Sequence, residues 1–195
     1  VATSHDSVLK LTDAISDDIK YFSEQVSILI ENSYLQTYER NIHFEILSTL
    51  VEAIDERDDE TGEHSERLVE YALKIGEEIG LSSEEMKDLR FAAVLHDIGK
   101  IGIPDQILLK EGSLTEKEIE TMKRHSQLGS NIVSKISSLE NVGKIILHHH
   151  ERWDGEGYPD GLNRDSIPVL SRIITIIDSF DTITSERPYK RARSQ

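Results

Sequence analysis

Cysteine is absent from the 195 residues, so disulfides and thiolate metal sites are excluded. No apolar run approaches the roughly 18 residues of a membrane span, and no secretory signal pattern opens the chain. We therefore expect no membrane contact by this chain and a cytoplasmic location. Cationic residues are also scarce. The chain contains 22 Lys and Arg but 37 Asp and Glu, which gives a formal charge of −15. Such a surface repels phosphate backbones, so binding to DNA or RNA is not expected.

Proline is missing before Pro104, and the alternation of apolar and polar residues typical of strands is scarce. Both features predict an all-α protein. Residues 1–50 are predicted to form one long helix. Residues 51–195 are predicted to form shorter helices with clear start and stop signals, which indicates a compact domain. The segments Ser82-x-x-Glu85 and Thr115-x-x-Glu118 are capping boxes, which mark helix starts. A last helix is expected to begin at Pro168.

The first helix carries an apolar heptad seam with steps of 4, 3, 4 and 3, made by Ile15, Ile19, Phe22, Val26 and Leu29. Ser33 and Gln36 interrupt this seam. One interpretation is a coiled-coil signalling helix that forms a homodimer and transmits changes from an upstream sensory domain. The other is an amphipathic helix that docks on its own domain. Two heptads do not decide between them.

Histidines and carboxylates continue the apolar stripes of the later helices. Glu60 and His64 are spaced by four residues and lead into a core stripe at Leu68. His96 and Asp97 end the next stripe, and His125 follows Met122 by three. His149 and His150 each lie four residues after an isoleucine, on the apolar side of the helix. His148 instead lies four residues after Lys144, on the polar side. Burying such groups without partners costs several kcal/mol, so partners are required.

Asp178 and Asp181 lie in a last helix that is apolar nearly all round, from Ile173 to Phe180, which predicts its burial. Eight inward-facing donors result from these patterns, with no comparable supply of buried Lys or Arg: Glu60, His64, His96, Asp97, His125, His149, His150 and Asp178. This predicts a metal centre. Imidazole and carboxylate without sulfur suit iron, manganese, cobalt or zinc. We expect two or three divalent metal ions, with iron or manganese as the first candidates.

The motifs narrow the expectation further. The segments HDIGKIGIPD (96–105), HHER (149–152), WDGEGYPDGL (153–162) and RPYK (187–190) resemble the HD-GYP family of cyclic di-GMP phosphodiesterases, within the HD phosphohydrolase superfamily. The resemblance implies a compact HD-type helical bundle. It also implies hydrolysis of cyclic di-GMP to pGpG, GMP or both, in bacterial second-messenger signalling. Domains of this family usually continue past RPYK, so we expect this chain to lack the end of its domain.

The resemblance also implies roles for individual residues. The metal ligands are His64, His96, Asp97, His125, His149, His150 and Asp178, with Asp97 as the bridge and catalytic centre. Glu60 corresponds to an extra ligand that allows a third metal. Lys100 contacts the scissile phosphate and acts in catalysis. Substrate contacts are further implied for Tyr158, Arg187 and Lys190. From their positions alone, Asp181 is expected to orient a ligand histidine or an arginine, and Trp153 to anchor the loop.

Three alternatives stay open. An HD hydrolase could act on another cyclic dinucleotide, such as cyclic GMP-AMP, because base-recognising residues cannot be located in the sequence. A catalytically silent receptor could bind cyclic di-GMP without cleaving it, although the complete ligand set argues against this. A helical interaction module would bind no metal at all.

Overall fold

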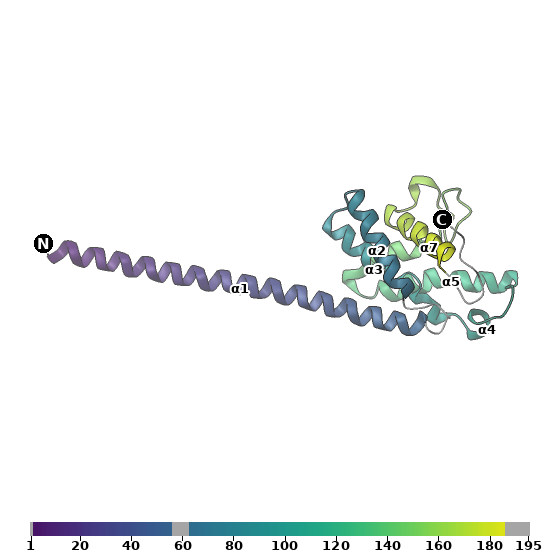
Figure 1. Cartoon of the computed structure of the whole chain (residues 1–195), viewed down its shortest axis with the longest axis horizontal. Coiled ribbons are helices and arrows are strands. Elements are labelled where there is room, and N and C mark those ends of the chain that lie inside the picture. Colours follow the sequence, from purple (N-terminus) through teal and green to yellow (C-terminus); the bar gives the residue numbers. More distant parts are fainter. Residues whose placement is uncertain (1, 56–62, 186–195) are drawn as a thin grey trace. The chain divides into compact units, whose positions relative to one another are not determined.

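The computed structural model describes residues 2–55 and 63–185. These residues form helices and loops without a strand, so the all-α prediction is confirmed (Figure 1). The α-helices are α1 (Ala2–Asp55), α2 (Glu63–Glu78), α3 (Ser83–Leu95), α4 (Asp105–Leu108), α5 (Glu116–Val133), α6 (Glu140–Leu147) and α7 (Val169–Thr184). In the described part of the chain, three 3₁₀ helices connect them: η2 (Ile98–Gly102), η3 (Ser137–Leu139) and η4 (Arg164–Ser166). By backbone contacts the chain divides into two compact units, residues 1–46 and 47–195.

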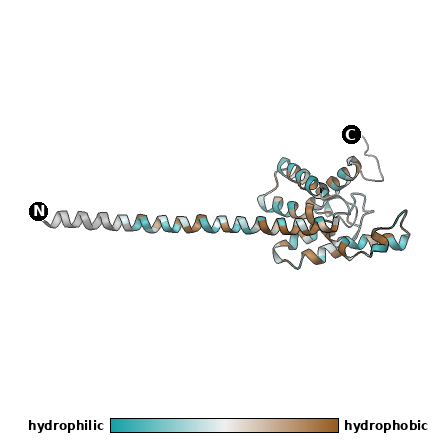
Figure 2. Ribbon diagram, turned by 60° about the horizontal axis from the view of Figure 1, so that its bottom comes forward, coloured by the Kyte–Doolittle hydropathy of each residue, from teal (hydrophilic) through white to brown (hydrophobic). Residues whose placement is uncertain are grey.

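The first unit consists of the greater part of α1. Ser33 and Gln36 interrupt its apolar seam but not its backbone, which stays helical throughout. Where side chains are described, the seam is exposed, with Ile19, Phe22 and Leu29 each at least 64% accessible. Hydrophobic residues recur along the helix in Figure 2. Even so, none of the described helices is both long enough and apolar enough to cross a membrane.

The second unit is a bundle in which α2 packs on α3 and α7, and α5 packs on α6 and η2. Its core holds aliphatic side chains that are fully buried, among them Leu68, Leu89, Ile146 and Ile174. The helix starts follow the predicted capping boxes. The hydroxyl of the N-cap residue accepts a hydrogen bond from the backbone N–H three residues later, at Ser82 and at Thr115. Pro168 directly precedes α7, as expected.

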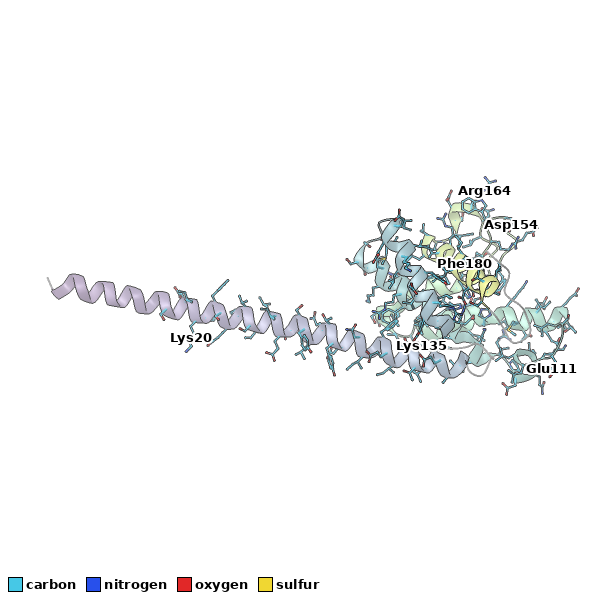
Figure 3. The ribbon with its side chains drawn as sticks, in the orientation of Figure 1. Lys20, Glu111, Lys135, Asp154, Arg164 and Phe180 are labelled. Carbon is cyan, nitrogen blue, oxygen red and sulfur yellow. The ribbon has the colours of Figure 1, made fainter. Side chains whose placement is uncertain are left out.

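The last helix departs from its predicted environment. Ile173, Ile174 and Ile177 are buried, but Ile176 is 62% exposed and Phe180 is 41% exposed. The prediction of burial all round is therefore wrong for this face. The reason is that α7 contacts α2, α3 and α6, and these neighbours cover its inner face. Phe180, labelled on α7 in Figure 3, rests edge-on against the ring of Tyr71, 5.5 Å away.

Candidate metal centre

Seven of the eight predicted metal ligands lie within the described residues, and the structure gathers them into two groups. The Asp97 group consists of Asp97, His125, His149 and His150. The His64 group consists of His64, His96 and Asp178. Within each group, one donor atom per residue lies within 4.8 Å of all the others. Glu60 lies outside the described residues.

These ligands come from five segments that are distant in sequence. His64 lies on α2, His125 on α5 and Asp178 on α7, while the paired positions follow the ends of α3 and α6. Gly99 explains how η2 reaches α5. A Cβ atom at this position would overlap the backbone of His125 and Gly129, so only glycine permits the close approach. That approach brings Asp97 to His125.

Asp97 connects the two groups through its two carboxylate oxygens. Its Oδ1 lies 3.3 Å from His125 Nε2 and 4.0 Å from His149 Nε2. Its Oδ2 lies 3.3 Å from His96 Nε2. Burial opposes ionisation of this carboxyl, but the neighbouring cation of Lys100 outweighs it and holds the pKa of Asp97 well below its usual value. An ionised carboxylate with one oxygen toward each group has the geometry of a bridging ligand.

The histidine rings are held with their Nε2 atoms facing inward. In three of them Nδ1 donates to the carbonyl oxygen three residues earlier, at 3.0 Å for His96, 2.8 Å for His125 and 2.6 Å for His149. Because a carbonyl oxygen can only accept, Nδ1 carries the proton and Nε2 keeps its lone pair. This arrangement fixes the tautomer of a metal-binding histidine.

The inward-facing nitrogens fit a cation better than they fit one another. His125 Nε2 lies 3.5 Å from His149 Nε2, and two bare lone pairs at that distance repel. The Nε2 atom of His64 is buried and has no hydrogen-bond partner among the described residues. Burial and the neighbouring rings lower the pKa of His149 well below its usual value and that of His150 to about 3. Since protonation does not relieve the repulsion near neutral pH, the donor set suits divalent cations.

Lys100 and Tyr158 border the Asp97 group. Lys100 is only 9% exposed, and its Nζ lies 3.0 Å from Asp97 Oδ2. The Tyr158 ring stacks on His150 with 4.8 Å between centroids. Lys123, which the sequence did not single out, places its Nζ 5.1 Å from the centroid of the same tyrosine ring. Arg187 and Lys190 lie outside the described residues.

The loop between α6 and α7 is folded back toward the histidines that precede it. A Cβ atom on Gly157 would overlap the backbone of Glu151 and Arg152, so glycine permits the fold. The Tyr158 N–H then donates to the His150 carbonyl at 3.2 Å. Glu151, a buried carboxylate that sequence reasoning missed, accepts from the Asp160 N–H at 2.7 Å. Its only sequence signal was its place directly after the paired histidines.

Trp153 and His148 lie on the outer side of this loop. Trp153 is 57% exposed, and the Arg172 guanidinium lies 5.7 Å from the centroid of its ring. The prediction of a hydrophobic anchor is therefore wrong, because the ring packs against a cation at the surface. His148 Nε2 contacts Asp160 at 3.0 Å, and this histidine belongs to neither ligand group, as the spacing predicted. Figure 3 labels Asp154 and Arg164 on the same connection.

Known proteins resemble this chain at the level of sequence. A cyclic di-GMP phosphodiesterase of Thermotoga maritima is 48% identical over 152 residues, which is 77% of this chain and 41% of that protein. The cyclic di-GMP phosphodiesterase response regulator RpfG of Xanthomonas campestris is 48% identical over 150 residues, 76% of this chain and 40% of the regulator. A 3′3′-cGAMP-specific phosphodiesterase of Vibrio cholerae is 35% identical over 174 residues, which is 88% of this chain and 33% of that protein. The chain thus spans about two fifths or less of the length of these relatives.

A solved structure shares the fold. The crystal structure of a cyclic GMP-AMP-specific phosphodiesterase of Vibrio cholerae superimposes with a TM-score of 0.53 at 22% identity, over 70% of this chain and 40% of the other. Residues 48–195 also match the HD domain as a family. That match covers the second compact unit almost completely, including every predicted metal ligand. The chain therefore belongs to the HD domain family.

Proposed function

We propose that this chain carries the catalytic part of a metal-dependent phosphodiesterase that hydrolyses cyclic di-GMP. The observation that carries the proposal is the pair of buried histidine and carboxylate groups joined by Asp97. Two metal ions bridged by a carboxylate are typical of phosphoester hydrolases. The two relatives at 48% identity are both described as cyclic di-GMP phosphodiesterases, which supports this substrate.

Each part of the site has a role in this proposal. The seven described ligands, together with Glu60, hold divalent ions, which when bound polarise the phosphate and lower the pKa of an attacking water. Lys100 places a buried cation beside Asp97, where it stabilises charge that grows on the phosphate oxygens in the transition state. Tyr158 lies against His150 of the Asp97 group, and it is proposed to contact the substrate there, as the GEGYP motif implies. Arg187 and Lys190 are proposed to contact the substrate, as the RPYK motif implies.

A second substrate has support of its own, since three relatives from Vibrio cholerae are described as 3′3′-cGAMP-specific phosphodiesterases. The distinguishing experiment incubates Mn²⁺-loaded or anaerobically Fe²⁺-loaded protein with each dinucleotide separately and follows the products by chromatography. We expect pGpG or GMP from cyclic di-GMP, at a higher kcat/KM than for cyclic GMP-AMP. The reverse preference would move the assignment to cyclic GMP-AMP. Tight binding of cyclic di-GMP without any product would indicate a silent receptor.

The number of metal ions is proposed to be two or three, with iron or manganese as the natural metal. Two follow from the two donor groups, and a third would depend on Glu60. We therefore expect Glu60→Ala to keep at least two ions per chain while losing at most the third. Elemental analysis of anaerobically purified protein measures this directly, with Glu66→Ala on an exposed position of α2 as the matched control. Loss of all metal from the Glu60 variant would show that Glu60 belongs to the core ligand set.

The first unit is proposed to act as a connector. Its exposed apolar seam, which includes Ile19, Phe22 and Leu29, offers a surface that a second copy can cover in a coiled coil. We propose a homodimer through this helix and a sensory domain in the longer protein, which is one of the two interpretations that the heptad spacing left open. Residues 1–50 would then serve signalling and residues 51–195 catalysis.

A further inference from the structure

Asp181 is held between a predicted metal ligand and an arginine. Its Oδ2 accepts a hydrogen bond from His64 Nδ1 at 2.7 Å. Arg67 donates two hydrogen bonds to the same carboxylate, from Nε to Oδ1 at 2.6 Å and from Nη2 to Oδ2 at 2.9 Å. Asp181 is 1% exposed, so these bonds are sheltered from water. The chain Arg67–Asp181–His64 joins α2 to α7 and ends at the His64 group.

The charge on Asp181 depends on this chain of contacts. Arg67 is a permanent cation that donates to both oxygens, and His64 Nδ1 donates to one of them, so the carboxylate is surrounded by donors. An ionised carboxylate only accepts hydrogen bonds, so the proton of the His64 ring stays on Nδ1. The Nε2 atom is then bare and points toward Asp178, whose Oδ1 lies 3.8 Å away.

His64 donates its Nδ1 proton to a carboxylate, whereas other histidines of the site donate theirs to a backbone carbonyl. Three of the described ligands, His96, His125 and His149, have such neutral partners. A charged partner increases the basicity of the ring, which makes Nε2 a stronger ligand for a divalent ion. A bidentate arginine also fixes the orientation of the carboxylate more tightly than a lysine would.

We propose that Arg67 and Asp181 are positioning residues that fix the tautomer of His64 and thereby set the metal affinity of the His64 group. The inference rests on the proposed function in that this group binds a divalent ion. Neither residue belongs to the two donor groups. Their effect passes through the imidazole of His64, so the two donor groups should respond differently when the chain of contacts is broken.

The test is Asp181→Asn, which keeps the side-chain shape and removes the charge. Metal-free protein is titrated with Mn²⁺ in a calorimeter, and the affinities of the two classes of site are fitted. We expect one class to weaken by about 10- to 100-fold, the usual effect of losing a partner of a ligand histidine, while the other class changes little. Asp165→Asn is the matched control, because Asp165 also contacts an arginine, Arg172, but faces no predicted ligand.

A second readout separates positioning from a purely structural role. In metal-free protein, ¹⁵N spectra of the histidine rings should show His64 protonated at Nδ1, and Asp181→Asn should shift this tautomer toward Nε2–H. Arg67→Met serves if the Asp181 variant does not fold, and Arg67→Lys should restore part of the lost affinity. Unchanged Mn²⁺ affinity and tautomer in a folded variant would overturn the inference while leaving the proposed function intact. Unaltered protein that binds no Mn²⁺ would overturn the proposed function itself.

Discussion

Asp97→Ala is expected to abolish metal retention and turnover together. Asp97 places one oxygen beside each donor group, so its loss is expected to remove the proposed bridging ligand from both groups at once. It also leaves the neighbouring cation of Lys100 without the carboxylate 3.0 Å away. In the proposed mechanism several kcal/mol of transition-state stabilisation depend on the metals, so kcat/KM should fall by about 1,000-fold or more. Elemental analysis and the chromatographic assay measure the two losses on the same preparation.

The control for this variant is Asp88→Ala, which removes another buried carboxylate, from α3, outside both donor groups. It should keep its metal and its activity even if its stability falls. A thermal melt of both metal-free variants shows whether the Asp97 protein is folded. Full metal content and activity in the Asp97→Ala protein would remove the bridging role and the mechanism that rests on it.

Acid is expected to destabilise the metal-free protein strongly, because buried histidines resist protonation. Burial, and then the neighbouring His125, lowers the folded-state pKa of His150 to about 3, whereas an unfolded histidine titrates near 6.5. Above pH 6.5 the ring is neutral in both states and contributes nothing to the pH dependence. Below that pH the unfolded chain binds the proton and the folded chain does not, so stability falls until about pH 3. Between pH 6.5 and 4.5 this amounts to about 2 kcal/mol for His150 alone.

Urea unfolding at pH 6.5, 5.5 and 4.5 measures this dependence, and His150→Gln should flatten it. His149 shifts in the same direction, so the variant keeps part of the slope. The carboxylate of Asp181 contributes in another window, because its folded-state pKa of about 2 lies below its usual value and its stabilisation is lost only as the pH falls below 4. Equal slopes for the variant and the unaltered protein between pH 6.5 and 4.5 would show that His150 is not held neutral in the fold.

Much of the fold was predictable from local patterns. The capping boxes at Ser82 and Thr115 fixed two helix starts, because their hydrogen bonds span only three residues. The prediction that His149 and His150, and not His148, belong to the donor cluster was also local, since it came from their spacing of four residues from Ile145 and Ile146. In the structure α6 ends at Leu147, and both histidines lie just beyond it. The burial of Ile176 was predicted wrongly, because periodicity shows that a face is apolar but not whether a neighbour covers it.

The sequence by itself determined the all-α class, the set of candidate donors and the absence of thiolate ligands. Those properties depend on residue type and on spacing along a helix, and both can be read directly from the amino-acid sequence. Only the tertiary structure decided that the donors form two groups, that Asp97 joins them, and that Arg67 and Asp181 support His64. Asp181 lies 117 residues from His64 in the chain, and their contact requires α2 to pack on α7. Such a contact depends on how loops direct helices against one another, which no local period specifies.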